Sequence, residues 1–113
     1  MITSTENAEH YTWGNNCDGW PLLRSDSLSV IQERMPPATA EQLHYHDRAQ
    51  QVFYILLGIA TFEIEGEVQT VLASQSIHIQ PKTKHRILNN GDSDLHFLVI
   101  SEPKTQGDRV NLH

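Results

Sequence analysis

Short runs in which apolar and polar residues alternate make up most of this chain. Apolar residues at i, i+3, i+4 and i+7, the spacing of an amphipathic helix, do not persist for more than two turns. Thr61-Phe62-Glu63-Ile64-Glu65 alternates strictly, which is typical of a strand with one face in water. The pattern predicts strands over residues 27–35, 42–46, 51–57, 61–65, 68–72, 76–80, 85–88 and 95–101.

Turn-forming residues separate these predicted strands. The separators are Pro36-Pro37, Gly58, Glu65-Gly66-Glu67, Pro81 and Asn90-Gly91. Short strands with a turn every eight to twelve residues or so are typical of a β-sandwich or barrel. We therefore expect an all-β barrel over residues 26–102, preceded by an irregular arm over residues 1–25 and followed by a loosely held polar tail over residues 103–113.

Two of the predicted strands are apolar on both faces. In residues 51–57 and 96–100, apolar side chains occur at both odd-numbered and even-numbered positions, which point to opposite faces of the strand. Neither face is therefore suited to contact with water. The inner face would join the core, and the outer face needs a cover. The arm with its two tryptophans or a second subunit could supply that cover. For so small a barrel we favour the second subunit and predict a homodimer.

The composition limits the partners to be considered. The 113 residues carry 8 Lys and Arg against 14 Asp and Glu, a formal net charge of −6, which is the wrong sign for holding nucleic acid or anionic lipid. No stretch approaches the ~18 apolar residues of a spanning helix, and the N-terminus does not resemble a secretion signal. Cys17 is the single cysteine, so no intrachain disulfide can form. These features predict a cytoplasmic protein that binds neither nucleic acid nor membranes.

Three histidines are candidates for metal binding. His44 and His46 lie two residues apart on a predicted strand, so both imidazoles point to one face, about 6.6 Å apart along the strand. Two imidazoles at this spacing can share one metal ion, although hydrogen-bonded, partly exposed histidines would give the same pattern. His85 begins a later strand after a proline turn, and by itself it is more typical of a structural or solvated histidine.

Taken together, these two segments resemble the motifs of the cupin superfamily. The first motif, G-x5-H-x-H-x(3,4)-E-x6-G, is matched by His44-Tyr45-His46, by Gln51 at the position of the glutamate, and by Gly58. The second motif, G-x5-P-x-G-x2-H-x3-N, is matched by His85 and Asn89. Ser74, Gln80 and Lys82 replace turn residues of the second motif, where other polar residues can serve.

The resemblance covers about residues 28–101 and implies a double-stranded β-helix, or jelly-roll, barrel that is commonly dimeric and holds a metal inside. Carried over by position, the metal ligands would be His44, His46, Gln51 and His85. Because Gln51 replaces a glutamate, a divalent ion would keep its full +2 charge. Such an ion would polarise a bound oxygen more strongly and attract anionic ligands.

The expected metal and pocket follow from these ligands. Zinc uses three imidazoles with an open position for Lewis-acid work, and the family includes three-histidine iron dioxygenases. We therefore expect zinc or iron(II), with manganese, nickel and copper as alternatives. Phe53 and Ile55 share the parity of Gln51 and are expected to line the pocket, whereas Tyr54 is a weaker candidate for donating its hydroxyl to a ligand.

The resemblance implies several functions between which the sequence does not choose. The first is a metalloenzyme that acts on a small organic molecule as a dioxygenase, an isomerase, or a cyclase or dehydratase. Isomerisation would need a base other than the missing glutamate, such as Glu33 or Glu41, which the sequence does not place. The second is a non-catalytic module that binds or senses a small ligand, and the third is a metal-free structural domain.

Overall fold

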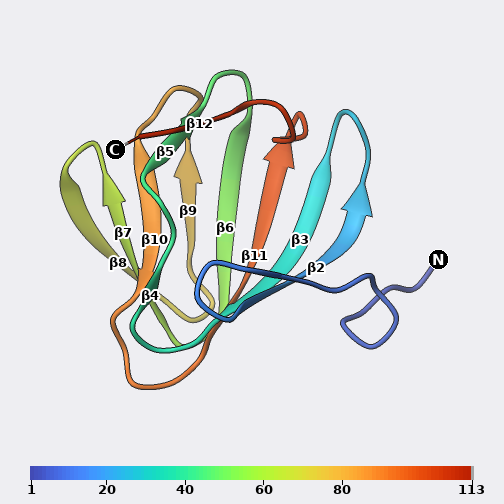
Figure 1. The fold of residues 1–113 in the computed structure, drawn as a ribbon, viewed down its shortest axis with the longest axis horizontal. Coiled ribbons are helices and arrows are strands. Elements are labelled where there is room, and N and C mark those ends of the chain that lie inside the picture. Colours follow the sequence, from blue (N-terminus) through green and yellow to red (C-terminus); the bar gives the residue numbers. More distant parts are fainter. Residues whose placement is uncertain (113) are drawn as a thin grey trace.

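The computed structural model describes residues 1–112, which form two antiparallel β-sheets packed as a jelly-roll barrel (Figure 1). The first sheet contains, in order across the sheet, β1 (Tyr11–Trp13), β2 (Cys17–Arg24), β3 (Ser29–Met35), β11 (Leu95–Glu102), β6 (Gln50–Leu57) and β9 (Ser76–Ile79). The second contains β12 (Arg109–Asn111), β5 (His44–His46), β10 (His85–Asn89), β7 (Ile59–Ile64) and β8 (Glu67–Leu72), with β4 (Thr39–Ala40) paired to β10. No helix of the described part is long and apolar enough to cross a membrane.

The all-β prediction is confirmed, and each of the predicted strands is present with ends that differ by a few residues. The β7–β8 hairpin shows why local pattern was sufficient here. Glu65 and Gly66 both have positive φ, 50° and 84°, which is the backbone of the tight two-residue turn that matches strand twist.

The expectation of an irregular arm was wrong for β1 and β2. β2 pairs with β3 from Asp18–Arg34 to Arg24–Ser29 and extends the first sheet. Its sequence hides this role because Gly19 and Pro21 interrupt the alternation, and proline cannot donate a ladder hydrogen bond. A register shift beside Pro21 accommodates the proline.

The C-terminal tail is also held more firmly than predicted. Figure 1 shows this segment, in dark red, crossing one end of the barrel from β11 to β5. There β12 pairs along the whole of β5, with Arg109 opposite His46 and Asn111 opposite His44. A three-residue strand of this kind has too little local pattern to be recognised in a sequence.

The interior of the barrel is apolar at one end and polar at the other. Along the paired strands β6 and β11, the inward side chains change from Ile55 and Phe97 to Phe53 and Val99, and then to Gln51 and Ser101. The apolar end is closed by side chains that are at most 1% exposed, namely Met35, Ile55, Phe62, Ile87, Leu95 and Phe97. The polar end is where the candidate site lies.

Candidate metal centre

Strand register brings the three predicted histidines together. β5 and β10 pair so that His44 lies directly opposite His85, and His46 follows on the same face of β5. The ring centroids of His44 and His85 are 4.3 Å apart, and those of His44 and His46 are 4.9 Å apart. All three residues are buried, and each offers a nitrogen within 4.8 Å of the others. The three histidines could therefore hold one metal ion.

Backbone carbonyls fix the orientation of two of these rings. Nδ1 of His44 lies 2.8 Å from the Gln42 carbonyl oxygen, and Nδ1 of His85 lies 2.8 Å from the Thr83 carbonyl oxygen. Each Nδ1–H therefore donates, which leaves Nε2 with a free lone pair. A backbone carbonyl behind the ring is the usual outer support of a metal-ligating histidine.

The site also holds a group of unsatisfied polar atoms. Among residues 1–112, the buried side-chain nitrogen and oxygen atoms without a hydrogen-bond partner are His46 Nδ1, Gln51 Oε1 and His85 Nε2. Buried polar atoms are nearly always paired, and an unpaired one costs about 1–3 kcal/mol. Three such atoms on the predicted ligands form a donor set that a cation would satisfy, so the residues present fit a divalent metal ion.

Burial keeps the three imidazoles neutral. Desolvation lowers the pKa of His44 to about 3 and that of His46 to about 4, and the positive charge of Arg109 acts in the same direction. Desolvation likewise lowers the pKa of His85. Neutral imidazoles have the free lone pairs that metal binding requires.

Gln51 reaches the site from the opposite sheet. Its side chain is 6% exposed, and its Nε2 donates to Ser101 Oγ at 3.0 Å. That hydrogen bond fixes the amide so that Oε1 remains free, and Gln51 lines the same cavity as His44 and His46. The structure thus places the fourth predicted ligand beside the histidines, with its oxygen available.

The three predicted pocket residues lie in different environments. Phe53 lines the cavity, and its ring centroid is 6.3 Å from that of His85. Ile55 shares this parity but is completely buried in the apolar core, beyond the cavity. Tyr54 is 38% exposed on the outer face of β6 and does not line the cavity, because alternate residues of a strand point to opposite faces.

The cavity has a volume of about 370 Å³, which suits a small organic molecule. Its wall includes Glu33 and Glu41, the two carboxyls that the sequence could not place. Desolvation raises the pKa of Glu33 to about 8, with the nearby charge of Glu41 adding to the shift, and desolvation raises the pKa of Glu41 to about 7. Arg109 is the one arginine or lysine among the described residues of this wall. Its Nη1 lies 3.6 Å from Glu41 Oε2.

The residues that sequence reasoning missed come mainly from the C-terminal segment. Thr105, Gln106, Gly107 and Arg109 line the cavity. Asp108 is 5% exposed, and its carboxylate accepts hydrogen bonds from the backbone N–H groups of Arg48 and Ala49 at 2.9–3.2 Å. A polar tail without apolar alternation carried no signal of these roles.

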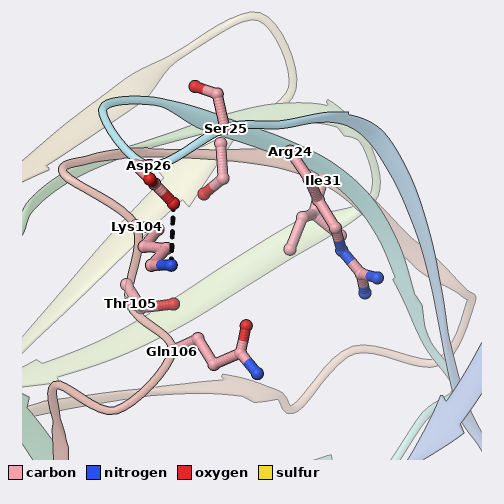
Figure 2. A pocket seen from close by; sticks show the side chains of 8 residues that line it. Arg24, Ser25, Asp26, Ile31, Lys104, Thr105 and Gln106 are labelled. Atoms are coloured by element: carbon pink, nitrogen blue, oxygen red, sulfur yellow. Dashed lines mark hydrogen bonds and ion pairs between the residues drawn. The ribbon is translucent and has the colours of Figure 1, made fainter.

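A second cavity of about 380 Å³ adjoins the first and shares Ile31, Thr105 and Gln106 with it. Figure 2 shows Lys104 of this cavity paired with Asp26, at 2.8 Å. The charged side chains that border this second cavity, Arg24, Asp26 and Lys104, are largely exposed to solvent.

Comparison with known proteins identifies the family. Residues 31–101 match the Cupin domain family; the match spans more than half of the chain, which therefore belongs to this family. An uncharacterized protein of Methanocaldococcus jannaschii is 32% identical over 82 residues, 73% of this chain and 66% of that protein. An oxalate-binding protein of Thermotoga maritima is 31% identical over 67 residues, 59% of this chain and 55% of that protein. The chain thus covers less than two thirds of the length of either relative.

The fold comparison agrees with this assignment. The crystal structure of a predicted oxalate decarboxylase from Thermotoga maritima superimposes with a TM-score of 0.84 over 92% of this chain and 100% of that chain. The two sequences are 22% identical, so this likeness concerns the fold alone. It supports the jelly-roll architecture described above.

Proposed function

Starting from this membership of the cupin family, we propose that the chain binds one divalent metal ion through His44, His46 and His85 and holds a small organic anion beside it. The observation that carries the proposal is the set of unpartnered buried atoms on His46, Gln51 and His85. A cation bound there would satisfy all three atoms at once, and an unpaired buried polar atom costs about 1–3 kcal/mol.

The donor set favours zinc or iron(II) as the ion. Three neutral imidazoles with a weak amide oxygen leave room for a further ligand, as in catalytic zinc sites. When bound, the ion would supply a positive charge that polarises an oxygen atom of the ligand. The chain supplies the rest: backbone carbonyls orient His44 and His85, and Phe53 closes the inner end of the cavity.

Several features support an anion as the ligand. The ligand set carries no negative charge, and the guanidinium of Arg109 faces the same cavity. The raised pKa values of Glu33 and Glu41 reduce the negative charge of the wall near neutral pH. The Thermotoga relative is named an oxalate-binding protein, and oxalate is a small dianion that could bind a metal ion through two oxygens.

Elemental analysis of the untagged protein, purified without chelator, tests the metal. We expect about one equivalent of a single metal in the wild type and almost none in the His44→Ala/His85→Ala variant. His78→Ala is the matched control, because His78 is an exposed histidine on β9. Calorimetric titration of the metal-loaded protein with oxalate then tests the anion. Metal that survives the double substitution would contradict the ligand assignment.

We also propose that the chain forms a homodimer through the outer face of the first sheet. There Tyr54 and Leu98 lie side by side, as do Val52 and Ile100, and none of the four is fully buried. An apolar sheet face of this kind needs a cover, and a second copy supplies a self-complementary one. Sedimentation should give a dimer at micromolar concentration, and Tyr54→Glu should weaken it; a compact wild-type monomer would contradict the proposal.

A further inference from the structure

A second set of polar groups faces the cavity from the sheet opposite the histidines. Tyr11, Gly19 and Glu33 lie in one row across β1, β2 and β3, because Tyr11 pairs with Gly19 and Gly19 pairs with Glu33. Tyr11 and Glu33 both line the cavity. Directly paired residues present their side chains to the same face of the sheet. The middle residue of this row is Gly19, which has no side chain.

The missing side chain at Gly19 allows the outer two residues to meet. A Cβ at Gly19 would lie 2.3 Å from Tyr11 Cζ and 2.6 Å from Tyr11 Oη, so the phenol ring lies directly over the glycine backbone. Neighbouring strands are about 4.8 Å apart, and the ring extends from β1 over β2 in the direction of β3. There the Tyr11 ring and the Glu33 carboxyl share the cavity wall, and burial together with the nearby Glu33 charge raises the pKa of Tyr11.

This arrangement leaves one oxygen of Glu33 available. Tyr11 lies on the β1 side of Glu33 in the same row, and a carboxyl group keeps an acceptor oxygen for a second partner in either protonation state. The carboxyl is partly buried in a cavity whose other sheet carries His44 and His46. A ligand that contacts the histidine side of the cavity would therefore present its far end to Glu33.

We propose that Glu33, held in place by Tyr11, accepts a hydrogen bond from a ligand hydroxyl, so that the cavity selects small carboxylates that also carry a hydroxyl group. The inference rests on the proposed function, in which the carboxylate end of the ligand lies at the metal centre. A hydroxyl suits this wall better than an ammonium group, because Arg109 faces the same cavity and would repel a ligand cation. Tyr11 and Gly19 are positioning residues in this scheme.

Calorimetric titration with a matched pair of ligands tests the inference. Pyruvate and 3-hydroxypyruvate offer the metal the same carboxylate and oxo oxygens and differ by one hydroxyl. The metal-loaded wild type should bind 3-hydroxypyruvate at least about tenfold more tightly, the effect of one hydrogen bond to a carboxyl group. Glu33→Met should abolish this preference, and Glu33→Gln, which keeps an acceptor oxygen, should retain part of it. In both variants the metal content should stay unchanged, and the affinity for pyruvate should change much less than the affinity for 3-hydroxypyruvate.

A double-mutant cycle tests the role of Gly19. Gly19→Ala should reduce the preference for 3-hydroxypyruvate by displacing the Tyr11 ring, and it should have no further effect in a Tyr11→Ala background, where no ring remains to displace. A general folding defect would instead persist in both backgrounds and would contradict the positioning role.

The possible failures can be told apart. Equal affinity of the metal-loaded wild type for the two ligands would overturn the Glu33 subsite and leave the metal centre standing. Metal-loaded protein that binds oxalate but neither member of the pair would also overturn the subsite alone. Absence of stoichiometric metal would contradict the proposed function itself, and the subsite inference with it.

Discussion

Replacing Asp108 by alanine should remove the clamp on the loop between His46 and Gln51. The Asp108 carboxylate, with a side chain 3% exposed, accepts from the backbone N–H groups of Arg48 at 3.0 Å and Ala49 at 2.9 Å. This loop connects a histidine of the second sheet with the glutamine of the first. A residue near the C-terminus therefore helps to position two predicted metal ligands.

The hydrogen bonds set the size of the effect. A hydrogen bond to a charged group contributes about 1.5–3 kcal/mol, and a buried donor left unpaired keeps its desolvation cost. For two backbone donors, Asp108→Ala should therefore lower the free energy of unfolding by about 3–5 kcal/mol. This is a large share of the 5–15 kcal/mol that is typical of a domain. Asp108→Asn keeps one acceptor oxygen and should cost roughly half as much.

Urea unfolding at neutral pH, with and without added metal, measures this loss. Although desolvation acts to raise it, the backbone hydrogen bonds lower the pKa of Asp108 below its usual value of 3.8, so its contribution is present above about pH 4 and is lost as the pH falls further. Asp26→Ala is the matched control. Asp26 also pairs with a cation, Lys104, but it is 96% exposed, so its removal should leave stability unchanged.

Metal affinity provides the second measurement on the same variants. The Asp108→Asn protein, which should remain folded, is expected to bind zinc about tenfold or more weakly than the wild type, since supporting hydrogen bonds around a metal site contribute at this level. Asp26→Ala should bind zinc normally. If Asp108→Ala costs less than about 1 kcal/mol, or if both aspartate variants behave alike, the clamp is not what holds the loop.

Three further predictions concern the cavity and the core. Gln51→Glu should tighten zinc binding by at least about tenfold in calorimetry, because a carboxylate adds an opposite charge to a neutral ligand set. The pKa of Glu33 is about 8 in the folded chain against 4.5 unfolded, so its contribution to stability is full below about pH 4.5 and is lost as the pH rises through 8. Urea unfolding at several pH values should therefore show the free energy of unfolding decline by up to a few kcal/mol over this range, and Glu33→Gln should flatten that decline. Ile55→Ala should cost about 2–5 kcal/mol of stability without loss of metal, whereas Leu57→Ala, at a side chain 59% exposed, should change the urea midpoint little.

The local pattern of the sequence determined most of the barrel. Alternating or continuously apolar short runs, bounded by turn residues, predicted the eight strands, and the two-residue spacing put His44 and His46 on one face. These properties depend only on neighbouring residues, so they can be recognised without knowing which strands pair. The spacing of the two histidine motifs added the family resemblance, and through it the ligand set.

Tertiary structure alone decided which distant residues meet. Register placed His85 opposite His44, and it put Tyr11, Gly19 and Glu33 in one row across three strands. The C-terminal segment became part of the site by pairing with β5, although its own sequence predicted a loose tail. Such contacts join residues far apart in the chain. Their free energy comes from burial and hydrogen bonds that exist only after the sheets have packed, so no local sequence pattern predicts them.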